Sequence, residues 1–451
     1  MASALRLAVA PVYLFLCLLL GGSAQGIWTN ALLQLLGVGI IAWAAAETRS
    51  EPLSRPAQAL GWLLLAGLAI VAVQLLPLPA SVWPHLGGRQ AFAEGYSVLG
   101  MAVPARPLSL APYQSLATLL TIIPALAMFV AIARLKAYRP AWLVVALVGG
   151  ALAGIMLGAL QLSSPDARAS QWYLYRQSSF GAAPGFFANV NNMAMLLLAC
   201  LPFLAAVLAS AKRKSVQRYS AMVALCAGAA LAMLIGVVVA GSLAGYGLLV
   251  PVLAASALLL IKRRGARRVV AGVAGLLLAG AVGALVLSPT GTGLTAPSTS
   301  AESRPIIMST TAEAAKDFLP FGSGLGTFRE VYQLYEDHDR LGNIHVNHAH
   351  NDYLELMLEL GIPGAVLLLA FLAWWVRSVA NAWRHADASP YARAASIASA
   401  VLLAHSLVEF PLRTAALSAC FAMCLALLVQ RRGIPKEQRA DLRPTRHVEL
   451  R

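Results

Sequence analysis

The chain has 451 residues, of which 59% are hydrophobic and 12% are charged, and its formal net charge is +15. A soluble globular chain carries about twice that charged fraction, so the composition excludes an ordinary soluble protein. The positive charge does not indicate nucleic-acid binding, because most Lys and Arg residues lie in short clusters between apolar runs, where topology signals occur.

Apolar runs of about 20 residues recur along nearly the whole chain, and each is long enough to cross a bilayer as a helix. We therefore predict an all-α polytopic membrane protein with about twelve transmembrane helices, the first of them kept as an uncleaved span. All five cysteines lie inside these runs and are interpreted as small core residues. The expected spans are 5–23, 27–46, 58–78, 114–133, 141–161, 190–210, 220–240, 243–261, 269–288, 361–381, 394–410 and 414–430.

Lys and Arg residues set the expected orientation. With the N-terminus in the cytoplasm, 25 of the 34 Lys and Arg residues fall in cytoplasmic segments and 9 in periplasmic ones. Because positive residues are retained on the cytoplasmic side, we expect a multi-pass protein of the bacterial inner membrane with both termini in the cytoplasm.

Three segments on the expected periplasmic side are long, namely 79–113, 162–189 and 289–360. Long segments with their own structure are usually functional, and the last one contains aromatic, charged and His residues. Its first part, 288–303, is rich in Ser, Thr, Pro and Gly and is expected to be flexible. The expected organisation is nine helices in 1–288, a large periplasmic loop with short helices and the active site in 289–360, three helices in 361–430, and a basic cytoplasmic tail in 431–451.

The end of the third loop is the most informative segment, because His345, His348 and His350 fall within six residues. Asn351 or Asp352 is expected to cap a helix, which places His350 at a helix N-terminus. The helix dipole disfavours an imidazolium there, and a neutral imidazole can accept a proton from a hydroxyl group. Two alternatives stay open: the histidines hold a metal ion, or they belong to a solvated loop.

Acidic residues follow on the predicted helix. Asp352, Glu355 and Glu359 share one face of the helix, because Glu355 and Glu359 lie three and seven positions after Asp352. Glu355 and Glu359 either orient His350 or the molecule whose hydroxyl group it deprotonates, or they form a solvated helix face. Farther along the chain, Glu409 and Arg413 in a short outside turn are candidates for an ion pair that ties two helices.

Four motifs in order resemble the O-antigen ligase and Wzy-type polymerase superfamily, and together they cover roughly 176–412. The first is the His350-Asn351 pair followed, after nine residues, by Gly361 and, after two more, by Gly364. The other three are an Asn-rich stretch that opens a membrane helix, a Pro- and Gly-containing turn, and a penultimate helix. They lie at 179–192, 317–328 and 405–412, respectively.

The resemblance implies a GT-C-like membrane fold and a metal-independent, inverting glycosyltransferase without a cofactor. It implies a donor glycan on undecaprenyl diphosphate, with membrane lipids around it and a lipid A-core sugar or another glycan as acceptor. The essential His of the family maps onto His350, and Arg176 matches one of the arginines proposed to hold the diphosphate. Relatives often carry a second Arg where this chain has Leu243, and Arg304 is the candidate that supplies the missing charge.

The chemistry gives an independent reason for arginines. Without a metal, a cation must offset the charge that grows on the diphosphate as the sugar leaves, and the planar guanidinium binds phosphate with two hydrogen bonds. Four further residues are expected to bind or orient the substrates: His348, Asn351, Glu359 and Asn191. Asn191 and its neighbours alternatively cap the sixth membrane helix.

Several functions fit these observations. An O-antigen ligase would pass a glycan to a lipid A-core acceptor, a Wzy-type polymerase would extend a lipid-linked glycan, and a protein O-glycosyltransferase would modify Ser or Thr. A polysaccharide or lipid transporter or flippase is the alternative of another class. Transporters usually place ionisable residues within their spans, whereas here the polar residues gather in outside loops, which favours an enzyme.

Overall fold

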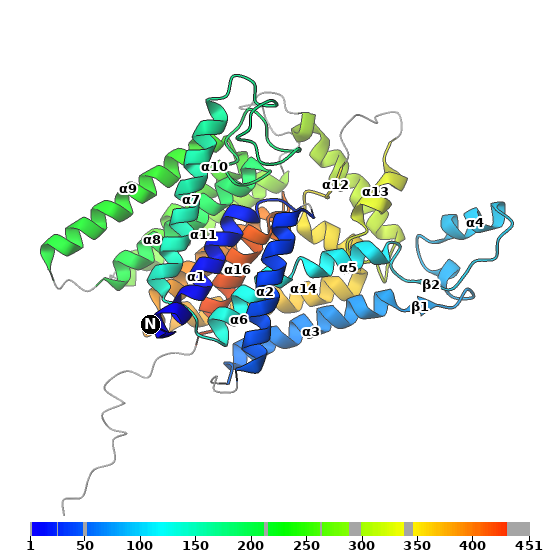
Figure 1. Ribbon diagram of the computed structural model, residues 1–451, viewed down its shortest axis with the longest axis horizontal. Helices are drawn as coiled ribbons and strands as arrows, with labels where there is room; N and C mark the ends of the chain where they lie inside the picture. Colours follow the sequence, from blue (N-terminus) through cyan, green and yellow to red (C-terminus); the bar gives the residue numbers. More distant parts are fainter. Residues whose placement is uncertain are drawn as a thin grey trace, which may run out of the picture.

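The computed structural model describes residues 2–24, 26–47, 52–211, 215–261, 264–287, 299–337 and 346–430. It is mostly helical, as predicted, and one large bundle dominates it (Figure 1). The helices of the bundle are α1 (Ala2–Leu20), α2 (Trp28–Ala46), α3 (Arg55–Leu75), α5 (Pro112–Leu120), α6 (Ile123–Ala133), α7 (Pro140–Leu162), α8 (Val190–Ser210), α9 (Val216–Ala240), α10 (Leu243–Ala257), α11 (Arg264–Leu287), α14 (Asp352–Arg384), α15 (Pro390–His405) and α16 (Ala415–Leu428).

Each predicted span overlaps a helix, and the span expected at 114–133 is formed by α5 and α6 together, whereas the span expected at 394–410 is helical only to His405. By length and composition, seven helices within the described residues can cross a membrane, with α5 and α6 taken as one. Four shorter apolar helices accompany them, at Ala4–Leu20, Leu243–Ala257, Arg268–Gly280 and Ala415–Leu428. The structure therefore confirms a multi-pass helical protein.

The core of the bundle is built around α8, α15 and α16. Every residue of α8 from Asn192 to Ala206 is buried, and α16 buries most of its side chains as well. Many of these residues are Ala or Ser, whose small side chains let helix backbones approach closely inside a membrane domain. The central helices thus form a packed support for the loops at their ends.

Each of the three long loops predicted on the same side is tied by backbone hydrogen bonds to another loop or to a neighbouring segment. The backbone N–H of Leu110 donates to the carbonyl of Ser323 (2.9 Å), which joins the first loop to the third. The N–H of Ala188 donates to the carbonyl of Gly22 (3.1 Å), which ties the second loop to the segment after α1. Elsewhere in the bundle, an ion pair of 3.2 Å joins Arg6 to Glu47.

The third loop contains two helices, α12 (Thr299–Asp317) and α13 (Phe328–Tyr335). The expectation of a flexible stretch at 288–303 is wrong for its last five residues, because α12 begins at Thr299. Residues 288–298 of that stretch lie outside the described residues, as does the tail 431–451.

Helix α14 is longer than the predicted span, because it begins nine residues earlier and continues through a kink. At the kink, Gly361 has a φ of 60° and a ψ of −147°, values that a residue with a side chain rarely adopts. The kink interrupts the helical hydrogen bonds, and the turn at 317–327 replaces some of them. The N–H groups of Ser323 and Gly324 donate to the carbonyls of Leu358 and Glu359, both at 2.9 Å.

A small arm projects beyond the bundle, at the right in Figure 1. It comprises the antiparallel strands β1 (Pro77–Leu78) and β2 (Arg106–Pro107), the 3-10 helix η1 (Trp83–His85) and α4 (Gln90–Val98). Arg89 anchors it, since the buried guanidinium donates to the carbonyls of Gly87, Leu108 and Gly322. Burial lowers the pKa of Arg89 to about 10. The arm is thereby fixed to the turn that supports the kink of α14.

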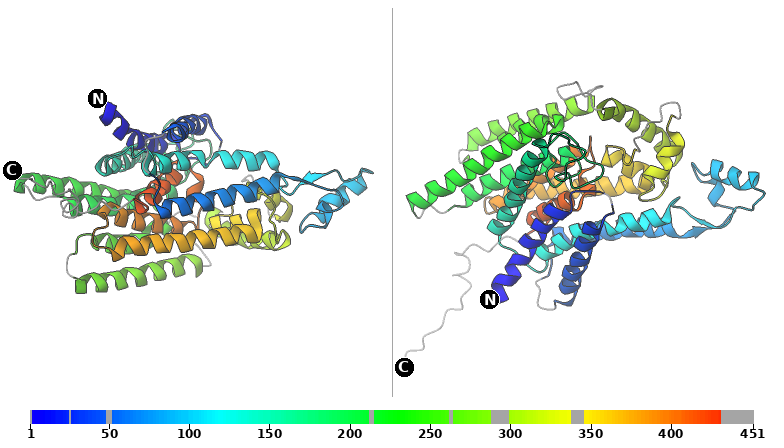
Figure 2. Two further views of the ribbon diagram at one scale, coloured as in Figure 1. Left: turned by 90° about the horizontal axis from the view of Figure 1, so that it is seen from below. Right: turned by 45° about the horizontal axis from the view of Figure 1, so that its top comes forward.

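Figure 2 shows α3 and α14 running side by side toward this end of the molecule. Gln74, near the end of α3, is buried and donates from Nε2 to the carbonyls of Phe321 (3.1 Å) and Glu359 (2.9 Å). Its Oε1 accepts from the N–H of Leu325 (3.1 Å). One amide side chain thus joins α3, the turn and the kink, and the N-terminal part of α14 is held in a fixed position.

Candidate active site

His350 immediately precedes the N-cap of α14, as predicted. The side chain of Asn351 accepts hydrogen bonds from the N–H groups of Tyr353 and Leu354, both at 3.0 Å, which confirms it as the N-cap. The backbone of His350 is left-handed, with a φ of 51°, a conformation uncommon for a residue other than glycine. Such local strain is often found at functional sites, where the surrounding structure enforces it.

Glu409 is the partner of His350. Helix α15 ends at His405, and Glu409 lies in the following turn with only 1% of its side chain exposed. Its Oε2 atom is 3.2 Å from Nδ1 of His350 and accepts from Nδ2 of Asn189 at 3.2 Å. Its Oε1 atom accepts from Nδ2 of Asn191 at 2.9 Å and from Nη2 of Arg304. Four side chains from three separate segments therefore converge on one buried carboxylate.

The surroundings of Glu409 keep it ionised. Burial alone would raise the pKa of Glu409, but the Arg304 guanidinium and the His350 ring outweigh burial, and the resulting pKa lies well below the ordinary value. An ionised carboxylate can only accept hydrogen bonds, so Nδ1 of His350 carries the proton between them. In the neutral ring, Nε2 is then left as the proton acceptor.

The structure brings Asn191 and Arg304 to the site and places Leu243 beside a residue that contacts Asn191. The Oδ1 atom of Asn191 accepts from the hydroxyl of Ser242 (2.7 Å), which also caps α10. Leu243 follows Ser242 directly and is the first residue of α10, with 36% exposure. Arg304 from α12 therefore binds the carboxylate directly, and Ser242, which precedes Leu243, is connected to the same carboxylate through Asn191.

Arg176 is not joined to His350 within the described residues. It is exposed, and it makes no hydrogen bond or ion pair with the described part of the chain. The loop that carries it is nevertheless fixed on both sides of it. Tyr175 donates to the carbonyl of Phe186 (3.0 Å) and Ser178 to that of Ala188 (3.3 Å), directly before Asn189.

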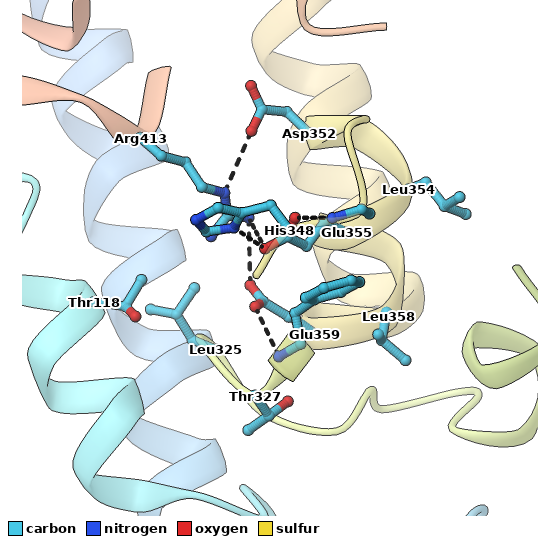
Figure 3. Close-up of polar contacts among 12 residues, drawn as sticks. Thr118, Leu325, Thr327, His348, Asp352, Leu354, Glu355, Leu358, Glu359 and Arg413 are labelled. Atoms are coloured by element: carbon cyan, nitrogen blue, oxygen red, sulfur yellow. Dashed lines mark hydrogen bonds and ion pairs between the residues drawn. The ribbon is translucent and has the colours of Figure 1, made fainter. Parts of the chain in front are cut away.

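A second histidine–carboxylate pair lies beside the first, and Figure 3 shows its surroundings. Nδ1 of His348 is 2.9 Å from Oε1 of Glu355, and Oε2 of Glu355 accepts from the N–H of Ala349 at 2.9 Å. Glu355 therefore contacts His348 and not His350. The interpretation of Glu355 and Glu359 as a solvated face is wrong, since both are buried.

Arg413 connects the acidic residues of α14 (Figure 3). Its Nε is 3.3 Å from Asp352, and its Nη2 is 3.1 Å from Glu355 and 3.7 Å from Glu359. This confirms that the three carboxylates share a face, and it corrects the idea of a Glu409–Arg413 pair. The two residues point to different clusters. Burial alone would lower the pKa of Arg413, but the carboxylates of Glu355, Glu359 and Asp352 outweigh it and raise that pKa above its usual value.

Phe410 separates the two pairs. Its ring centroid is 4.3 Å from that of His348 and 5.2 Å from that of His350. Within the described residues, no group of three or more His, Cys, Asp or Glu side chains is placed to hold a metal ion. His345, the third member of the possible metal site, lies outside those residues.

Glu409 is the main site residue whose role the sequence did not reveal. Arg413 lies four positions farther along the chain and carries the opposite charge, so the sequence pattern favours an ion pair of Glu409 with Arg413 over a contact with His350. The useful signal was the motif at 405–412, which places Glu409 in the same resemblance as His350.

Comparison with known proteins supports the resemblance. Residues 228–369 match the model of a family described as O-antigen ligase. The match includes Arg304 and His350 and ends before Glu409. No curated protein matches the chain.

Proposed function

We propose that this chain, a member of the O-antigen ligase superfamily, transfers a glycan from undecaprenyl diphosphate to an acceptor at the periplasmic face of the inner membrane. The family implies a glycosyl-transfer enzyme of the ligase type or a related polymerase. The observation that carries our proposal is the pairing of His350 with a buried Glu409 that also holds Arg304. A proton acceptor and a cation for phosphate thus lie within one cluster.

The proposed reaction is a single displacement. Nε2 of His350 accepts the proton of an acceptor hydroxyl, whose oxygen forms a bond to the anomeric carbon of the donor sugar. The bond from that carbon to the phosphate oxygen breaks, and the diphosphate leaves with the electron pair. Arg304 offsets the growing negative charge, with Arg176 as a second candidate, and neither a metal nor a cofactor takes part. One displacement without a covalent intermediate inverts the anomeric configuration.

The remaining site residues divide into two groups. Asn191, Asn351 and Glu359 use their polar groups within the protein, so we assign them to orienting the site. His348 keeps 18% of its side chain exposed, so a substrate can reach it. We assign it to binding the acceptor.

The membrane setting follows from the distribution of Lys and Arg. If the segments with more positive charge face the cytoplasm, the end that carries His350 faces the periplasm. We propose twelve spans in a GT-C-like arrangement, with the active site in the loop at 289–360 and the basic tail in the cytoplasm. The lipid tail of the donor would enter sideways between helices from the outer leaflet.

Of the possible acceptors, we place the lipid A-core or a related surface glycan first. A Wzy-type polymerase is the alternative within the same chemistry. A transporter or flippase is less well supported, because the two ionised clusters around Glu409 and Arg413 lie in and beside the loops at one end of the bundle.

Lipid-linked intermediates in a deletion strain test the function. Long glycans that accumulate on the carrier indicate a lost ligase, and single repeat units indicate a lost polymerase. The defect should be rescued by the normal chain and by a His385→Ala variant, whose exposed residue lies at the far end of α14. Unchanged surface glycans and carrier-linked intermediates would contradict glycan transfer.

A further inference from the structure

Arg304 and His350 share one carboxylate through different oxygens. Arg304 binds Oε1 of Glu409, and His350 lies against Oε2. The Arg304 side chain is 33% exposed, and its Nε atom is buried without a hydrogen-bond partner among the described residues. The guanidinium therefore holds Glu409 with one edge and keeps hydrogen-bond donors for another acceptor.

We propose that Glu409 is a positioning residue that couples anion binding at Arg304 to the proton affinity of His350. This inference rests on the proposed function, in which Arg304 receives the diphosphate of the donor. An anion that binds Arg304 competes with Glu409 for the guanidinium. The charge of Glu409 is then neutralised less by Arg304, and His350 becomes a stronger base.

The charges around Glu409 make this coupling direct. Besides Arg304 and His350, the titratable group that faces Glu409 is His405, one helical turn earlier in α15. Asn189 and Asn191 donate to the carboxylate without carrying a charge. The remaining charged groups nearby lie across Phe410 and contact one another: Arg413, His348, Asp352, Glu355 and Glu359. Arg304 is thus the only permanent cation in contact with Glu409 among the described residues.

The coupling gives the order of events a physical basis. Before the donor arrives, Arg304 neutralises Glu409, and the carboxylate attracts the proton of the imidazole less strongly. Once the diphosphate binds, the same carboxylate favours the protonated ring, since an opposite charge within reach favours the charged form. The base therefore becomes strong enough to accept the proton of the acceptor hydroxyl when a sugar is in place to be transferred.

NMR of the full-length protein in nanodiscs with isotope-labelled histidine tests the inference without donor or acceptor. The signal of His350 is assigned by its loss in His350→Gln. We expect Arg304→Gln to raise the pH at which His350 is half protonated by roughly one pH unit. In the double variant Arg304→Gln/Glu409→Gln, the midpoint of His350 should not lie above that of Glu409→Gln alone. A midpoint that Arg304→Gln leaves unchanged would overturn the coupling.

Inorganic pyrophosphate provides a second measurement, which needs no Arg304 variant. It should shift the His350 midpoint upward in the normal protein and much less in Glu409→Gln, whereas Glu409→Asp should retain most of the shift. Equal shifts in the normal protein and Glu409→Gln would show a direct effect of the anion and would overturn the role of Glu409. If the normal protein shows these midpoint shifts but transfers no glycan, the proposed function is refuted and the coupling still holds.

Discussion

The two histidine–carboxylate pairs lie on either side of Phe410 and differ in what surrounds the carboxylate. Glu409 is the single acidic group of its cluster and meets one guanidinium, two amides and His350. Glu355 belongs to a cluster of three carboxylates around Arg413. The Arg304 side chain of the first cluster is 33% exposed, whereas that of Arg413 is 19% exposed and contacts three carboxylates.

From this difference we infer that the cluster around Glu409 takes part in the reaction and that the cluster around Arg413 stabilises the structure. The first cluster has a cation with unused donors and a strained histidine, so it can respond to a charged substrate. In the second cluster, three carboxylates already offset the charge of the single cation. The second cluster holds the first turns of α14 in place, and His350 precedes those turns. Substitutions on the two sides should therefore have different consequences.

The largest difference is expected between the two histidines. Replacing His350 with Ala should reduce glycan transfer by about 10²- to 10⁴-fold, because it removes the general base. Replacing His348 with Ala should reduce it by about tenfold or less, since one lost hydrogen bond contributes about 1 kcal/mol. Transfer rates of the purified variants, with expression and donor synthesis as controls, measure both. Equal losses would remove the distinction, and an active His350→Ala variant would remove the base assignment.

The two carboxylate clusters should differ in stability. Arg413→Gln leaves three carboxylates without their shared cation, and breaking such a buried pair costs about 3–5 kcal/mol of folding free energy. Glu409→Gln keeps the shape of the side chain and leaves Arg304 partly in water, so it should unfold at a higher temperature than Arg413→Gln while losing most activity. Thermal unfolding in one detergent compares them. Greater stability of Arg413→Gln than of Glu409→Gln would contradict the supporting role of the second cluster.

The smallest effect is expected from chelation. Incubating the purified enzyme with EDTA should leave the transfer rate unchanged, because arginine and not a metal is proposed to offset the charge of the leaving group. Adding back Mg²⁺ or Zn²⁺ serves as the control. Strong inhibition by EDTA that a metal ion reverses would favour the metal interpretation of the His-rich segment.

Local patterns were sufficient to predict part of this site. Helical spacing predicted the common face of Asp352, Glu355 and Glu359, and capping chemistry predicted Asn351, because both depend on neighbouring residues alone. The partner of His350 depends on tertiary packing. Glu409 lies 59 positions along the chain and reaches the histidine because the end of α15 packs against the start of α14.

The kink at Gly361 shows the same limit. The sequence predicted a helix capped at Asn351 or Asp352 and a membrane span from 361, whereas the structure joins the two in one helix that bends at the glycine. The bend depends on hydrogen bonds from the turn at 317–327 and from Gln74, two segments remote in the sequence. Apolar run length gives no information on such contacts, although it located the helices of the bundle.

A structure of the protein with undecaprenyl diphosphate tests the central claim most directly. The account predicts that the phosphate oxygens lie within hydrogen-bond distance of Arg304, with the oxygen that would carry the sugar directed toward Nε2 of His350. A diphosphate bound at the opposite end of the bundle, or against Arg413 with the Arg304–Glu409 ion pair untouched, would contradict it.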